Sequence, residues 1–431
     1  MRYELEKTRR TLELPTAEFV VAVTLLLLLM VNASNQLGGI WAGAHSATKF
    51  FAYMVLGGVL FLYYLGNAER SLFPLAVALA GVVCIALLNE CLFPGTATEA
   101  RSVVGRFAVL CLPLLFVAAR IKEPQQLYAS MTRFSIASTV IVLVLLLVHF
   151  VAPSPSGSAY SMGLGYAILP FALVSFNEVV RAEQRKSSRV LYALCFLAQF
   201  AGIVLLGSRG PIACIAVFAV VVCVRRCRAG NVPAVFVVAL FAVLVAGVMH
   251  EELLRLVADM LSATGFSRTG YLIEQFLESG QVHVSGRDVV QAPLLDAIWA
   301  DPLAWRGIAA DRVAVGMNAH NLFIEVAYCF GMVAAAATVL FVLLYLVKVI
   351  CLPPSVWGDL VSIFFSCSIP TLMFSGSVWD STMLWIGIGL LYACRRRAGL
   401  ANLDRNQFCL DLGTQCQEEK RIEGLECDTK K

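Results

Sequence analysis

The chain has 431 residues, of which 59% are hydrophobic and only 14% are charged, and its formal net charge is +4. Soluble globular domains carry about 25% charged residues, so this composition excludes that class and predicts an all-α integral membrane protein. The basic residues fall in short loops between apolar runs, which argues against nucleic-acid binding. Most of the 14 cysteines lie inside apolar runs and the longest polar loop has none, which argues against a disulfide framework.

Apolar runs of membrane-spanning length predict about twelve transmembrane helices. The runs cover residues 19–33, 50–66, 72–93, 102–119, 134–152, 160–180, 190–207, 211–224, 232–249, 322–347, 356–374 and 377–394. We interpret the first run as a span because no clear signal-peptide cleavage site follows it.

Lysine and arginine concentrate in alternate connections, which predicts the orientation of the spans. The rich set includes residues 2–10, 120–133, 181–189, 225–228 and 395–397, whereas the other short connections carry only Lys49, Arg101 and Arg209. The rich set is therefore expected on the cytoplasmic side of the membrane, with both termini cytoplasmic.

Four regions follow from this pattern: transmembrane helices 1–9 in residues 1–250, a large loop in 251–319 on the side opposite the termini, transmembrane helices 10–12 in 320–397 and a cytoplasmic tail in 398–431. The loop holds nine acidic residues and five arginines, so it is acidic overall. Residues 253–261 and 290–299 have apolar side chains at helical spacing and predict short amphipathic helices on the membrane face. The alternative is that these helices cover the bundle without taking part in chemistry.

His320 stands where a polar loop turns into the apolar run that begins at Leu322. Asn318 or Asn321 can cap the start of this helix. The partial positive charge of a helix start disfavours imidazolium, so a neutral histidine that can accept a proton is expected at this membrane surface. The alternative is an interfacial histidine that merely precedes a helix.

Arg209 opens another apolar run, in the segment Ser208–Arg209–Gly210–Pro211. Fifteen residues separate it from Arg225, and they span about 23 Å of helix against a hydrocarbon core of about 30 Å. Arg209 is therefore expected below the outer surface, where a diphosphate would match its guanidinium. An ion pair with Glu90 or Glu99, or snorkelling, is the alternative.

Three further side chains complete a predicted positive cluster on the same face: Arg287, Arg106 and Lys49. Arg287 follows a small flexible pair and precedes the second amphipathic stretch. For Arg106 and Lys49, contact with lipid headgroups is the simpler interpretation. No metal-ligand spacing and no glycine-rich phosphate loop occurs, so we expect neither a metal nor another cofactor.

Three motifs together resemble the O-antigen ligase and polymerase superfamily. They are SRG at 208–210, SGR at 285–287, and HN at 320–321 followed by nine residues and Gly331. Ala334 stands where the ligase motif has Gly, Thr or Tyr. The layout is similar too, with about twelve spans, cytoplasmic termini and a large periplasmic loop before the tenth.

The resemblance implies a glycosyltransferase that moves O-antigen polysaccharide from undecaprenyl diphosphate to the lipid A-core oligosaccharide, without a metal or nucleotide sugar. It implies that Arg209 and Arg287 bind the diphosphate and that His320 acts on the acceptor. We expect Arg106, Lys49 and Asn321 to contribute to substrate binding. Membrane lipid is an expected partner, and nucleic acid is not.

Two other functions stay open on the sequence alone. An O-antigen polymerase would use the same donor with a second lipid-linked glycan as acceptor. A transporter of the lipid-linked glycan is expected to show duplicated halves and charges along the membrane midplane, and the sequence shows no duplicated half.

Overall fold

The structure is a computed structural model. It describes residues 15–37, 44–151, 162–181, 186–206, 209–228 and 287–397, together with single residues between 255 and 274. All structural statements below concern these residues. Every regular element among them is helical, which confirms the predicted class.

Ten of the described helical segments are long and apolar enough to cross a membrane, so the chain is a multi-pass membrane protein. Nine of them are the helices α2 (Ala17–Leu37), α3 (Ala44–Gly66), α4 (Ala68–Leu92), α7 (Pro124–Val151), α8 (Met162–Val180), α9 (Lys186–Leu205), α10 (Arg209–Arg228), α16 (Leu322–Cys351) and α17 (Val356–Phe374). The tenth runs from Pro94 to Ala118. It is made of η1 (Pro94–Thr96), α5 (Ala97–Arg106), the π-helical turn η2 (Phe107–Cys111) and α6 (Leu112–Ala118).

Of the two remaining predicted spans, one lies outside the described residues and the other corresponds to a shorter helix. Residues 232–249 lie outside the described part of the chain. The last predicted span, 377–394, corresponds to a helix over residues 382–397, preceded by turns at 377–381. Helix starts also differ from the apolar runs: α7 begins at Pro124 rather than near 134, because its first turns carry polar side chains that a hydropathy pattern does not detect.

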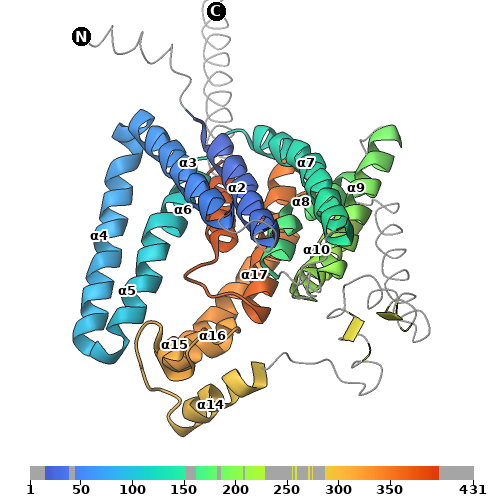
Figure 1. The fold of residues 1–431 in the computed structure, drawn as a ribbon. Coiled ribbons are helices and arrows are strands. Elements are labelled where there is room, and N and C mark those ends of the chain that lie inside the picture. Colours follow the sequence, from blue (N-terminus) through green and yellow to red (C-terminus); the bar gives the residue numbers. More distant parts are fainter. Residues whose placement is uncertain are drawn as a thin grey trace, which may run out of the picture.

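The helices α8 and α17 form the centre of the bundle and bury most of their side chains, whereas α4 and the long part of α16 expose most of theirs. Figure 1 shows α2, α3 and α7 packed side by side, with α4 and α5 at one edge of the molecule.

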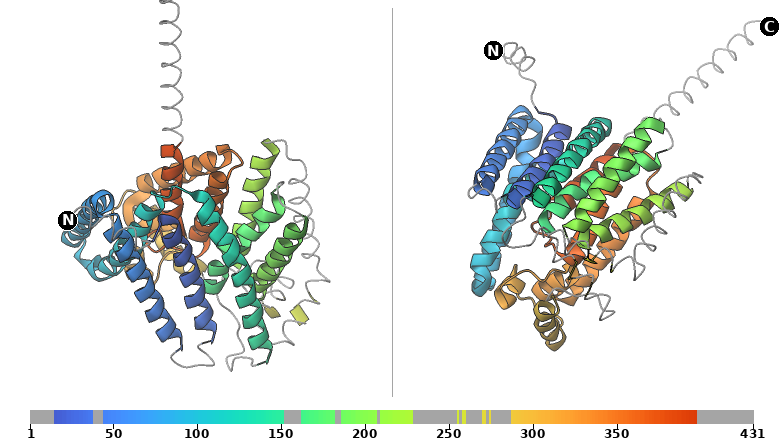
Figure 2. Two further views of the ribbon diagram at one scale, coloured as in Figure 1. Left: turned by 90° about the horizontal axis from the view of Figure 1, so that it is seen from above. Right: turned by 45° about the vertical axis from the view of Figure 1, so that its right-hand side comes forward.

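Two shorter helices, α14 (Arg287–Ala300) and α15 (Ala310–Val315), lie across one end of the bundle. Both Figure 1 and the right-hand view of Figure 2 show this placement. Of the two predicted amphipathic stretches, 290–299 is thus confirmed as helix, and most of 253–261 lies outside the described residues.

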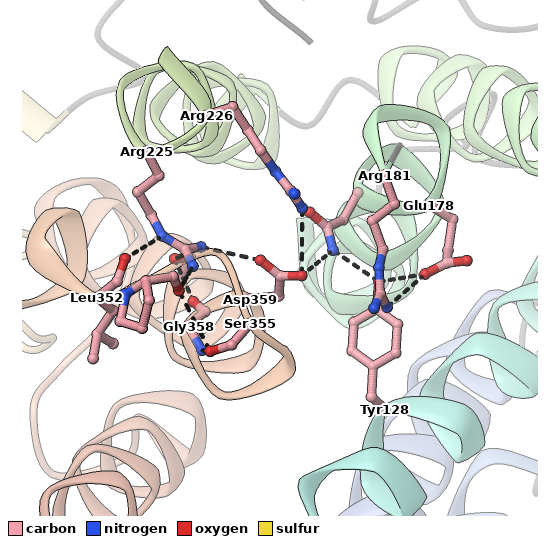
Figure 3. A network of polar contacts seen from close by, with 12 residues as sticks. Tyr128, Glu178, Arg181, Arg225, Arg226, Leu352, Ser355, Gly358 and Asp359 are labelled. Carbon is pink, nitrogen blue, oxygen red and sulfur yellow. Dashed lines mark hydrogen bonds and ion pairs between the residues drawn. The ribbon is translucent and has the colours of Figure 1, made fainter. Parts of the chain in front are cut away.

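A buried ion pair joins α10 to the start of α17 (Figure 3). Arg225 and Asp359 are each 2% exposed at the side chain, and Arg225 Nη1 lies 3.2 Å from Asp359 Oδ1. The same guanidinium donates to Ser362 Oγ at 2.9 Å and to the carbonyl oxygen of Pro353 at 2.8 Å. A Cβ on Gly358 would collide with Arg225 Nη2, so the close approach requires glycine there.

The network extends from Asp359 into α8 and α7. Asn177 Nδ2 donates to Asp359 Oδ2 at 3.1 Å and lies 2.8 Å from the Tyr128 hydroxyl. That hydroxyl donates to Glu178 Oε1 at 2.7 Å, and Arg181 pairs with the same carboxylate at 3.3 Å. Four helices are therefore joined at one end of the bundle by charged groups that would destabilise the fold if left unpaired.

We predict that Asp359→Ala destabilises the protein by about 3–5 kcal/mol, because it leaves the Arg225 guanidinium buried without its counter-charge. Thermal unfolding of the purified protein in detergent measures this loss. The control is Glu90→Ala, which breaks the pair with Arg101, whose side chain is 67% exposed; solvent screens that pair, so a small effect is expected. Equal melting temperatures for the two variants would contradict the structural role of the Asp359 network.

Candidate functional site

The backbone around His320 is fixed on both sides. Asn321 is the N-cap of α16, and its side-chain oxygen accepts from the N–H groups of Phe323 at 3.0 Å and Ile324 at 3.3 Å. This confirms one of the two predicted caps. His320 itself has φ 53°, in the left-handed region that is uncommon for residues other than glycine. A backbone held in this conformation directs the ring differently from a helical residue.

The residue before His320 is held from two helices. Asp311 Oδ2, from α15, accepts the N–H of Ala319 at 2.9 Å. Gln291 Nε2, from α14, donates to the carbonyl oxygen of Ala319 at 3.0 Å. The two helices that lie across the end of the bundle therefore position the loop that carries His320.

The imidazole ring contacts the end of α17. His320 Nδ1 lies 3.3 Å from the carbonyl oxygen of Ser375, the residue that follows α17. A carbonyl oxygen only accepts, so a neutral ring that makes this bond has its proton on Nδ1 and its lone pair on Nε2. The arrangement leaves Nε2 as the basic atom.

Burial is the largest cause that lowers the pKa of His320 below its usual value of 6.5. The bond to Ser375 and the charge of Asp311 oppose this shift, while the positive charge of Arg287 adds to it. The ring is therefore neutral at pH 7 and can accept a proton. The sequence predicted the direction from the helix start and nearby cations; burial is the main cause in the structure.

Arg287 begins α14 and is partly buried. Within the described part of the chain, no carboxylate lies within ion-pairing distance of its guanidinium. The positive charge of Arg287 contributes to lowering the pKa of His320, so the two groups are close enough to interact electrostatically.

The start of α10 contacts Tyr166, whose hydroxyl bonds to Ser375, the residue that also holds His320. The Tyr166 hydroxyl, from α8, donates to Ser375 Oγ at 3.0 Å. A Cβ on Gly210, in the first turn of α10, would collide with that hydroxyl oxygen. Gly210, the last residue of the predicted SRG segment, is therefore linked to His320 through Tyr166 and Ser375. The side chain of Arg209 lies outside the described residues.

Arg106 and Lys49 lie apart from this centre. Arg106 is 54% exposed and pairs with Asp380 at 3.3 Å, and Asp380 also pairs with Arg312 at 3.0 Å. Arg106 thus borders the site through Asp380. Lys49 is exposed on α3, its Nζ lies 6.0 Å from the Tyr53 ring centroid, and α3 packs mainly against α2. The structure does not bring Lys49 to His320.

Sequence reasoning missed the acidic partners of the site. Asp311 was counted only as one of the nine acids of the loop, Asp380 was not considered, and nothing in the local pattern marks either residue. Glu325 was visible as the one charge in an apolar run; it is buried, and its Oε1 accepts from Ser377 Oγ at 2.6 Å.

Among the described residues, no three histidine, cysteine, aspartate or glutamate side chains lie together in a way that could hold a metal ion.

The apolar run that starts at Leu322 is broken at Gly331. Gly331 has φ 82° and ψ 168°, so α16 consists of a short first part, residues 322–330, and a longer second part. A Cβ at this position would lie 3.2 Å from the carbonyl oxygen of Leu303. Both the positive φ and the close approach of the 301–309 loop require glycine.

The loop replaces the helical hydrogen bonds lost at the break. Met332 N–H would otherwise donate to the carbonyl of Tyr328; it donates to Pro302 O at 2.8 Å instead. Tyr328 O accepts from Arg306 Nη1 at 3.2 Å, and the backbone N–H of Arg306 donates to Cys329 O at 3.0 Å. The break is therefore a stable feature, because its buried polar groups are paired.

Comparison with protein-family models, with curated proteins and with solved structures finds no match. The resemblance stated above therefore rests on the residues of the three motifs and stays a prediction.

We predict that Gly331→Ala destabilises the protein by about 1–3 kcal/mol, because alanine is strained at this backbone conformation and its Cβ presses on the 301–309 loop. Gly81→Ala is the matched control, since a Cβ on Gly81, inside α4, meets nothing within 4 Å; a small gain is expected there. Thermal unfolding compares the two. A neutral Gly331→Ala would contradict the requirement for glycine at the break.

Proposed function

We propose that the protein is an inverting, metal-independent glycosyltransferase of the bacterial inner membrane, an O-antigen ligase. It transfers O-antigen polysaccharide from undecaprenyl diphosphate to the lipid A-core oligosaccharide. The observation that supports this most is the arrangement at Ser375: its carbonyl oxygen lies 3.3 Å from His320 Nδ1, and its hydroxyl accepts from Tyr166, against which Gly210 packs.

The chemistry requires one base and one site for negative charge. The acceptor hydroxyl attacks the anomeric carbon of the donor sugar, and its proton passes to His320 Nε2. The bond between that carbon and the diphosphate oxygen breaks, and the electron pair leaves with undecaprenyl diphosphate. Arg287 and Arg209 stabilise the charge that collects on the departing diphosphate.

The pairing of the arginines supports this assignment of roles. Arg225, Arg106 and Arg312 each have a carboxylate partner at 3.0–3.3 Å, whereas Arg287 has none among the described residues. A partly buried guanidinium with no counter-charge among the described residues suits an anionic substrate.

The direct experiment incubates the purified protein with undecaprenyl-diphosphate-linked O-antigen and either lipid A-core or no added acceptor, followed by gel analysis. Transfer to lipid A-core supports the ligase. Elongation of the donor glycan without lipid A-core would instead show the polymerase, and no covalent product in either case would contradict a glycosyltransferase.

We predict that His320→Ala and His320→Gln each lower turnover by about 10²- to 10⁴-fold, the usual contribution of a general base. Glutamine can still donate to the Ser375 carbonyl, so it separates the loss of the base from the loss of the hydrogen bond. In the unaltered protein, the rate should fall as pH drops through the lowered pKa of His320 and should be flat above neutrality. Full activity of His320→Gln would contradict the base role.

A further inference from the structure

Asp311 is an acidic side chain placed beside the base and used by no step above. It is fully buried in the first turn of α15. Its Oδ2 accepts the N–H of Ala319, and its Oδ1 accepts from Cys329 Sγ at 3.5 Å. The carboxylate therefore connects α15, the residue that precedes His320, and the first part of α16.

The elements around His320 carry several charged and titratable groups. They are Arg287 from α14, Asp311 and Arg312 from α15, Glu325 from α16, Tyr166 from α8, and Asp380 from the turn that follows α17. Arg312 and Asp380 pair with each other, and Glu325 bonds to Ser377. Arg287 and Asp311 are the two charges that act on the ring.

Proton transfer makes the balance of these two charges important. When the neutral ring accepts a proton, an imidazolium forms in a half-buried position near the cation of Arg287. Two positive charges in a site of low dielectric repel each other strongly. The Asp311 carboxylate, which accepts the N–H of the preceding residue Ala319 at 2.9 Å, carries a negative charge that offsets this repulsion.

We propose that Asp311 is the positioning residue of this site: its carboxylate holds the backbone that carries His320 and supplies the negative charge that stabilises the imidazolium. This inference rests on the proposed function, because it assumes that His320 takes up the proton of the acceptor.

The hydrogen bonds of Asp311 favour its charged form. Burial raises the pKa of this carboxyl, but the N–H of Ala319 comes first among the groups that oppose the shift, followed by the charge of Arg312 and the Cys329 thiol. The same bond to Ala319 N–H fixes the residue next to the left-handed backbone of His320. One side chain thus controls both the orientation of the ring and the stability of its protonated form.

The test replaces Asp311 by asparagine, which keeps the shape and an oxygen that can accept the Ala319 N–H but removes the charge. Two quantities are measured in detergent-purified protein. One is turnover in the transfer assay. The other is the rate at which diethyl pyrocarbonate modifies His320 across a range of pH, followed by peptide mass spectrometry; this reagent attacks the neutral ring, so the midpoint reports the pKa of His320 without any need for activity.

We expect Asp311→Asn to lower turnover about 10- to 100-fold, part of the contribution of a general base. The midpoint of His320 modification should move to lower pH, because the charge that stabilised imidazolium is gone. Asp296→Asn, an exposed acid on α14, is the matched control and should change neither quantity. If Asp311→Asn does not fold, Asp311→Ser makes the same test, since its hydroxyl oxygen can also accept the Ala319 N–H.

The outcomes separate this inference from the proposed function. A normal midpoint in Asp311→Asn overturns the inference, whether turnover is normal or falls, because the carboxylate would then act on the backbone alone. A lowered midpoint with reduced turnover supports it. If His320→Gln is fully active while the midpoint still moves, the proposed base role fails and the charge coupling between Asp311 and His320 stands.

Discussion

The break in α16 at Gly331 determines where His320 lies. An unbroken helix over residues 322–351 would carry the N-cap and the preceding histidine along one straight axis. The break instead makes the first part a separate short helix, held at one end by the Asn321 cap and at the other by the 301–309 loop. The nine residues between Asn321 and Gly331 are therefore the length of one structural unit. This gives a physical reason for the spacing between His320 and Gly331 in this chain.

A second constraint is the length of α17. Its first turn carries Asp359 in the buried network with Arg225, and the residue after its last turn, Ser375, holds His320. The helix has 19 residues, which span about 28 Å, close to the thickness of a hydrocarbon core. The two polar clusters thus lie about one membrane thickness apart. The network at one end fixes the central helices α8, α10 and α17, and the chemistry proposed here takes place at the other end.

The sequence predicted what depends on local pattern. Ten apolar runs became the described spans, and Asn321 caps α16 as its side chain and position indicated. The partners of His320 could not be predicted, because they come from distant segments: Ser375 lies 55 residues away, and Tyr166 lies 209 residues from Ser375. Hydropathy also could not detect the break, since the residues on both sides of Gly331 are equally apolar. Gly331 was visible only as a motif position, without the reason for it.

Charge counting gave a similar mixture of success and failure. It marked Arg287 as a candidate, and in the structure the positive charge of Arg287 contributes to lowering the pKa of His320. It grouped Lys49 with the same cluster, but α3 packs away from the site, and it did not anticipate that Asp380 pairs with Arg106 and Arg312. Net charge in a loop does not show which cations have acids within reach, and that pairing is what distinguishes Arg287 among the described arginines of the site.

The most direct test of the central claim is native mass spectrometry of the purified, delipidated protein with undecaprenyl diphosphate, and with undecaprenyl monophosphate for comparison. We expect the diphosphate to bind more tightly than the monophosphate. Arg209→Ala and Arg287→Ala should each weaken diphosphate binding about 10-fold or more, as expected for lost charge-assisted hydrogen bonds. Arg101→Ala, which removes an exposed arginine, should leave it unchanged. Equal diphosphate binding by all three variants would contradict a diphosphate site beside His320.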